Sequence, residues 1–140
     1  MRKTGSAIVN DVYELMVNSP IPSFILGKVY KHTRPTNSED EDCTIRFKTG
    51  LDNRLQDGNT QSGAVTINIY VPFIDNGSGT KVPNTGRIHE IETFIEPIIR
   101  SWSSAEYLFS IGDMIQSFED NSLEQSFIYV DLRFIKSTIF

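Results

Sequence analysis

Hydrophobic residues alternate strictly with other residue types near the middle of the chain. From Gly63 to Pro72 every second position carries a branched apolar side chain: Val65, Ile67, Ile69 and Val71, with Phe73 continuing the series. The positions between them are Thr66, Asn68 and Tyr70. Successive side chains of a strand point to opposite faces of a sheet. The pattern therefore predicts a long strand with one dry face and one wet face.

A first amphipathic helix is predicted near the N-terminus. Apolar residues recur at helical spacing from about Ser6 to Asn18, and polar residues occupy the opposite face. Ser6 is the expected N-cap, because its hydroxyl can accept a hydrogen bond from a free backbone N–H. Pro20 and Pro22 should end the helix.

A second helix is predicted from Arg87 to Trp102. Its apolar residues form one continuous stripe, which we expect to pack in the core: Ile88, Ile91, Ile95, Ile98 and Trp102. Pro97 lies inside this helix and removes one helical hydrogen bond. We therefore expect the helix to bend or break near Thr93.

Four further segments have the composition or alternation of strands: Gly27–Thr33, Cys43–Lys48, Tyr107–Phe118 and Ile128–Phe134. Turns are predicted at 34–38 and 119–122, a long polar loop at 49–62 and a flexible connection at 75–86. The order of elements is α-β-β-β-α-β-β. The predicted fold class is α+β, with an antiparallel β-sheet and two main helices packed on one face. Residues 1–140 are expected to form a single domain.

Composition narrows the range of functions. The net charge is −5, which opposes broad contact with nucleic-acid phosphates, although DNA could still pass without binding. No apolar run approaches the roughly 20 residues that span a bilayer, so no membrane contact is expected. The basic N-terminus leads into a helix rather than a signal-peptide core, which indicates a cytoplasmic origin. Cys43, the single cysteine, excludes an internal disulfide and is expected to be buried.

The sequence offers no catalytic motif. His32 and His89 have no partner at metal-ligand spacing and are expected to be solvated. The acidic run Glu39, Asp40, Glu41 and Asp42 could attract a hard cation, but a solvated, self-repelling loop is favoured. Gly77 and Gly79 are too close together for a phosphate-binding loop. Trp102 and Tyr107 could anchor an interface, but burial in the core is favoured. We therefore predict a protein that is not an enzyme and that binds no cofactor or metal.

The order of these pieces resembles the tail-completion, or tail-terminator, proteins of tailed bacteriophages, in the type found in phages or prophages of Bacteroidetes. The similarity is carried by an amphipathic helix and four further segments: Ile25–Tyr30, which is similar to the family's G-[RK]-[IV]-Y entry, the turn Arg34–Ser38, the strand Val65–Val71 that leads to the second helix, and the closing strand Phe127–Phe134. The polar insertion 49–62 and Pro97 depart from the family pattern.

The resemblance implies a tail-terminator-like fold and a structural role. Such subunits form a ring, commonly a hexamer, at the head–tail junction of the virion. The ring completes the tail, contacts neighbouring connector and tail proteins, and leaves a channel for DNA. A subunit of this kind would be assembled in the cytoplasm of the bacterial host. A ring requires a heterologous interface that closes on itself.

Candidate residues follow from the resemblance and the pattern. We expect the subunit interface to involve the edge and wet face of the central strand and the polar loop: Val65, Ile67, Asn68, Tyr70, Leu51 and Leu55. Acidic residues are expected to face the channel: Glu39, Asp40, Glu41, Asp42, Glu119 and Asp120. Two alternatives remain open. One is another connector component, such as an adaptor or stopper ring, for which a dodecamer is possible. The other is a small hydrolase or nuclease that uses the acidic run with magnesium.

Overall fold

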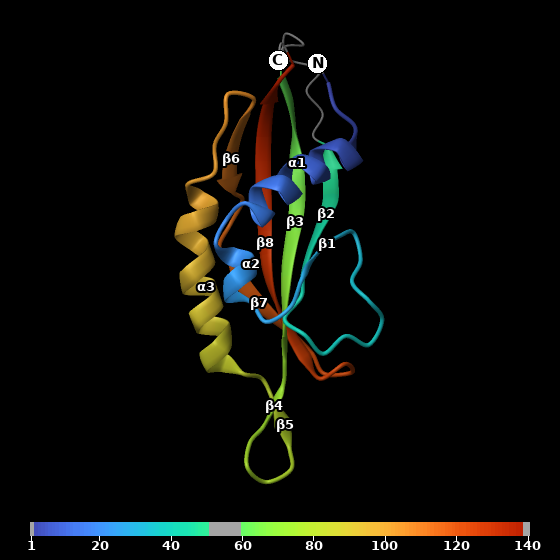
Figure 1. The fold of residues 1–140 in the computed structure, drawn as a ribbon, viewed down its shortest axis with the longest axis vertical. Coiled ribbons are helices and arrows are strands. Elements are labelled where there is room, and N and C mark those ends of the chain that lie inside the picture. Colours follow the sequence, from blue (N-terminus) through green and yellow to red (C-terminus); the bar gives the residue numbers. More distant parts are fainter. Residues whose placement is uncertain (1, 51–59, 139–140) are drawn as a thin grey trace.

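The protein has an α+β fold built on one main sheet (Figure 1). The computed structural model describes residues 2–50 and 60–138. In chain order the elements are α1 (Gly5–Val17), α2 (Ile21–Phe24), β1 (Val29–Lys31), β2 (Cys43–Gly50), β3 (Thr60–Pro72), β4 (Ile74–Asp75), β5 (Lys81–Val82), α3 (Thr85–Arg100), β6 (Tyr107–Ile111), β7 (Gln116–Asp120) and β8 (Gln125–Ser137). No helix among these is long and apolar enough to cross a membrane.

The main sheet has six strands in the order β1-β2-β3-β8-β6, and β7 also pairs with β8. Every pair is antiparallel except β1–β2, which is parallel, so the expectation of a purely antiparallel sheet is wrong. Parallel neighbours need a connection that returns the chain to its starting end. Residues 32–42 make this return, and His32 and Asn37 adopt left-handed backbone angles within it (φ 71° and 61°).

The central strand β3 confirms the alternating pattern. Its apolar positions are completely buried under the helices, whereas Thr66, Asn68 and Tyr70 are half-buried on the other side. β3 and β8 pair along their whole lengths, from Thr60 opposite Ser137 to Pro72 opposite Gln125. This long strand pair forms the centre of the sheet.

The loop predicted from Thr49 to Ser62 is shorter than expected. β2 continues to Gly50 and β3 begins at Thr60, and the two strands remain paired up to Gly50 opposite Gly63. Both ends of the predicted loop therefore belong to the sheet. Leu51 and Leu55, two of the predicted interface residues, lie outside the described residues.

The helices lie on one face of the sheet, as predicted (Figure 1). The N-cap of α1 is Thr4 rather than Ser6, because the Thr4 side chain accepts a hydrogen bond from the Ala7 N–H. The pair of prolines ends α1 but also begins the short helix α2, in which Pro22 occupies the first turn. A proline fits there because the first N–H groups of a helix need no internal partner.

Helix α3 runs without a break through Pro97, so the predicted break near Thr93 is wrong. Pro97 lies one turn from the C-terminal end, where the loss of one hydrogen bond is tolerated. The apolar stripe packs in the core as predicted, except that Ile99 is buried in place of Ile98. Trp102 follows the helix and is buried, as is Tyr107, which confirms the core interpretation of both residues.

The predicted strand Tyr107–Phe118 is divided into β6 and β7, which pair with different parts of β8. Ile111 lies opposite Leu132 and Gln116 opposite Tyr129, so residues 112–115 face only two residues of β8. The extra residues must leave the ladder, which interrupts the strand. The acids Glu119 and Asp120 are consequently the end of β7 and not part of a turn.

The predicted connection at 75–86 contains the small hairpin β4–β5. Figure 1 shows this hairpin projecting from one end of the molecule, away from the sheet and helices. Cys43 is a free thiol in the core, as predicted, and burial raises its pKa to about 12. It therefore behaves as a small apolar side chain.

Candidate functional site

The acidic run does not form one exposed cluster. Glu39 and Asp40 are exposed, but Glu41 and Asp42 are 6% and 1% exposed. The expectation that all four acids are solvated and face a channel is therefore wrong for Glu41 and Asp42. A carboxylate can be buried when it is paired and hydrogen-bonded, and both residues meet this condition.

Glu41 connects the start of the sheet to helix α3. Its two carboxylate oxygens accept hydrogen bonds from Nε and Nη2 of Arg87, each at 2.8 Å. The backbone N–H of Leu26 donates to the same carboxylate at 3.0 Å, and Arg87 also donates to the Phe24 carbonyl at 2.7 Å. The hydrogen bond to Glu41 raises the pKa of Arg87 above its ordinary value. This paired geometry is the strong, bidentate form of an ion pair.

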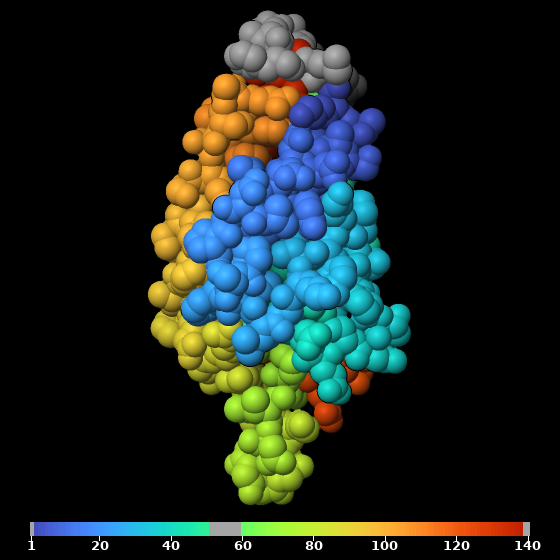
Figure 2. Space-filling model, viewed as in Figure 1, coloured from blue at the N-terminus to red at the C-terminus, as the bar shows by residue number. Residues whose placement is uncertain are grey.

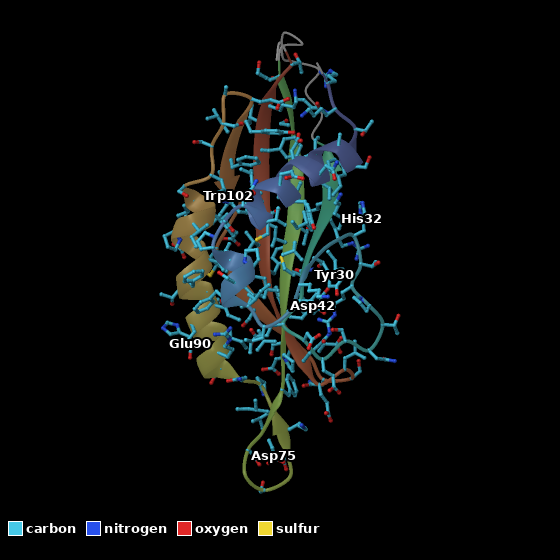
Figure 3. The ribbon with its side chains drawn as sticks, viewed as in Figure 1. Tyr30, His32, Asp42, Asp75, Glu90 and Trp102 are labelled. Atoms are coloured by element: carbon cyan, nitrogen blue, oxygen red, sulfur yellow. The ribbon has the colours of Figure 1, made fainter. Side chains whose placement is uncertain are left out.

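Asp42 holds the loop that leads into β2. It accepts hydrogen bonds from the Lys28 N–H at 3.0 Å and from the Ser38 hydroxyl, and Arg34 lies 3.6 Å away. Asp42 is buried, and Figure 3 shows it at the start of β2, beside the loop that precedes this strand. Glu41 and Asp42 thus bind different partners. The two neighbouring carboxylates therefore belong to separate hydrogen-bonded networks.

The remaining predicted acids gather at one end of the molecule. A cleft of about 400 Å³ is lined by residues 34–39, Tyr70, Leu123 and Gln125, and Gln125 pairs with Asp120. Asp120 is half-buried and accepts hydrogen bonds from Ser122 and Leu123, so it stabilises the β7–β8 turn. Glu39, Asp40 and Glu119 are exposed at this end. The fold therefore brings two acidic segments together that are distant in sequence.

The central strand cannot act as an exposed edge. β2 and β8 occupy its two sides, and Val65 and Ile67 are fully buried under the helices. The prediction that Val65 and Ile67 contact a neighbouring subunit is therefore wrong, because their apolar side chains build the subunit's own core. Asn68 and Tyr70 point to the opposite face of the sheet and remain candidates.

That opposite face of the sheet, here called the open face, carries no helix among the described residues. Four aromatic rings cross it from β3 to β7: Tyr70, Phe127, Phe118 and Tyr129. Their centroids lie 5.5–6.1 Å apart along the row. Phe118 is 43% exposed. Sequence analysis missed Phe118, Phe127 and Tyr129 as a group, although the alternation of the closing strand contained the signal.

Cations lie beside the aromatic row on the open face. Arg46 and Lys48 come from β2 and Arg133 from β8, and all three are exposed. Lys48 donates to the Tyr129 hydroxyl at 3.0 Å, which raises the pKa of Lys48 above its ordinary value. Asp131 lies between Lys48 and Arg133, 3.5 Å from each, and is almost fully buried. Three exposed cations therefore surround one nearly buried acid on the open face.

The opposite side of the molecule, here called the helix face, contains a cleft of about 500 Å³ between α1, the end of α3 and β6. Figure 2 shows this face, where blue N-terminal atoms meet orange ones. At one end of the cleft lies an ion network: Lys3 binds Asp11 at 2.6 Å and Glu106 at 3.1 Å, and Glu106 also binds the buried Lys136 at 3.0 Å. The Tyr107 hydroxyl donates to Asp11 at 2.6 Å.

Glu106 should make the free energy of unfolding depend on pH in the acidic range. Burial acts to raise the pKa of Glu106, but hydrogen bonds from Lys136 and Lys3 outweigh it and leave the pKa below its ordinary value of 4.5. A depressed carboxyl pKa stabilises the fold above the unfolded pKa, and this contribution is lost as the pH falls through the folded pKa. We expect Glu106→Gln to be less stable than wild type at neutral pH, with the difference shrinking below about pH 4.5.

Urea unfolding between about pH 3 and pH 7 measures this difference. Glu14→Gln is the matched control, because Glu14 is an exposed acid at the same cleft. A stability difference between wild type and Glu106→Gln that stays constant over the whole pH range would contradict the expectation.

His32 and His89 are both exposed, as predicted. Within residues 2–50 and 60–138 no group of three or more metal-ligating side chains could hold a metal ion. Comparison with models of known protein families finds no match, and neither does comparison with curated proteins.

Proposed function

We propose that this protein is a ring-forming structural subunit at the head–tail junction of a tailed bacteriophage, where it completes the tail and leaves a channel for DNA. The order of helices and strands and the motifs at Ile25–Tyr30 and Phe127–Phe134 support this function through their resemblance to tail-completion proteins. The subunit would assemble in the bacterial cytoplasm and contact neighbouring connector and tail proteins.

The open face is the observation that carries the proposal. Aromatic residues and arginine are enriched at protein interfaces, and exposed aromatic clusters commonly mark them. Here Phe118, Phe127 and Tyr129 lie together beside Arg46 and Arg133 on a face without a helix. Such a surface is typical of a subunit whose exposed aromatic side chains become buried when copies assemble.

The exposed acids at one end of the molecule suit a surface that lines a DNA channel. Glu39, Asp40 and Glu119 are exposed there, and like charge keeps DNA phosphates from binding. The projecting hairpin β4–β5 lies at the same end of the molecule and offers a contact to a neighbouring connector protein (Figure 3, Asp75).

Light scattering of the purified protein, combined with negative-stain electron microscopy, tests the proposal. We expect closed rings with about six times the chain mass of 15.9 kDa. Twelvefold rings would favour an adaptor ring instead. A monomer at every concentration up to the millimolar range would contradict both ring functions.

A further inference from the structure

Exposed cations lie on the open face of the subunit, and several exposed acids lie on its helix face. On the open face the exposed cations are Arg46, Lys48 and Arg133, and the one acid between them, Asp131, is nearly buried. On the helix face α3 turns Glu90 and Glu96 outward, and the exposed Glu14 lines the cleft. Figure 3 shows Glu90 on the outer side of α3.

The acids of the helix face are only partly neutralised within the subunit. Arg100 lies 3.1 Å from Glu96, but this is an exposed pair of the kind that contributes little. Arg87 reaches Glu90 at 3.3 Å with one nitrogen while its other nitrogens bind Glu41. No ion pair among the described residues involves Glu14. An external cation would therefore find an unpaired carboxylate at the cleft.

The cleft has a shape and chemistry that suit a long basic side chain. Its volume is about 500 Å³, and Leu15, Ile98 and Trp102 give it apolar walls. Arginine and lysine bury their methylene stems against apolar surface while their charged ends reach a polar rim. Glu14 at the cleft supplies a partner for that charged end.

We propose that the open face of one copy packs against the helix face of the next copy, with Arg46 and Arg133 directed at the acidic cleft and at α3. This inference rests on the proposed ring function and identifies the two surfaces that meet. Because the two surfaces differ, each copy offers one of each, and the contact repeats head to tail until the ring closes. The aromatic row becomes the buried centre of the contact, and the charges fix its register.

A second copy of the chain would provide partners for the charged residues of both faces, whereas a nucleic acid would provide partners only for those of the open face. Phosphates would suit Arg46, Lys48 and Arg133. They would leave the acidic helix face without a role, and the net charge of −5 would oppose their approach. The structure therefore favours the second copy as the occupant of the open face.

Charge reversal on each face separately provides the test. The sheet variant is Arg46→Glu with Arg133→Glu, and the helix variant is Glu14→Lys with Glu96→Lys. Each variant places like charges across the contact, so we expect the dissociation constant to rise about a hundredfold or more and each variant to be monomeric by light scattering. An equimolar mixture should form rings again, because the reversed sheet face of one variant matches the reversed helix face of the other.

Controls make each outcome decisive. Lys81→Glu reverses an exposed charge in the hairpin β4–β5, outside both faces, and should leave the rings intact. Circular dichroism and thermal unfolding confirm that the variants are folded, and glutamine at the same four positions gives gentler variants with a smaller expected loss. Wild-type protein that is monomeric overturns the proposed function and this inference together. Rings that survive both charge reversals, or variants that fail to reassemble when mixed, overturn this inference alone.

Discussion

Replacing Arg87 with alanine is expected to lower the free energy of unfolding by about 3 kcal/mol. Arg87 forms two hydrogen bonds of 2.8 Å to Glu41, which is only 6% exposed. Removing the guanidinium leaves the carboxylate buried without its counter-charge, and the Phe24 carbonyl loses its donor. Breaking one side of a buried ion pair is more damaging than removing the whole pair, because the remaining charge is uncompensated.

Urea unfolding of wild type and Arg87→Ala measures this loss. Arg100→Ala is the matched control, because Arg100 lies on the same helix and pairs with Glu96 at the surface. We expect the control to change stability by less than about 0.5 kcal/mol. Equal effects of the two substitutions would show that the Glu41–Arg87 pair has no special role in stability.

Gly27→Ala is expected to lower the free energy of unfolding by about 3 kcal/mol, which is large for the addition of one methyl group. A Cβ atom at Gly27 would lie 2.4 Å from the backbone carbonyl of Glu41 and 2.6 Å from the Asp42 carboxylate. Backbone atoms cannot move aside as a flexible side chain does. The substitution would also displace the Leu26 and Lys28 N–H groups, which donate to Glu41 and Asp42.

Thermal or urea unfolding of Gly27→Ala gives the measurement, with Gly86→Ala as its control. Gly86 lies in the first turn of α3, and a Cβ atom there would meet nothing within 4 Å. Alanine at this helical position should be neutral or stabilising by up to about 1 kcal/mol. A Gly27→Ala protein as stable as wild type would contradict the close packing at this turn.

The same turn gives Gly27 a structural role. Gly27 belongs to the segment Ile25–Tyr30. In the structure this glycine allows the chain before β1 to pass against Glu41 and Asp42. The segment Ile25–Tyr30 and the acidic residues Glu41 and Asp42 therefore form one structural contact.

Local pattern was sufficient for most of the elements. The alternation around Ile67, the spacing of isoleucines in α3 and the apolar position of Cys43 depend only on which side of an element is dry. These side chains are buried as predicted, except Ile98, which is half-buried. The predictions at the helix ends were less accurate, as at Thr4 and Pro97, because an N-cap depends on where the first turn begins and a tolerated proline depends on where the last turn ends.

Contacts between distant segments were beyond the reach of local pattern. The side chain of Arg87 lies 46 residues from Glu41 in sequence, so neither residue signals the pair by itself. The same applies to the strand order, which places β3 between β2 and β8 and removes it as an exposed edge. The open face became visible only when β7 and β8 were paired, because Phe118 and Phe127 meet across the two strands.

The sequence by itself determined the α+β class, the dry face of the central strand and the two helices that cover it, because hydrophobic periodicity is a local property of the chain. Only the tertiary structure decided which polar residues remain at the surface. Glu41 and Asp42 are buried because residues from other parts of the chain bind their carboxylates, whereas Arg46 and Arg133 are exposed on one face. Burial of a charge depends on a partner in space, and the identity of that partner is fixed by the fold.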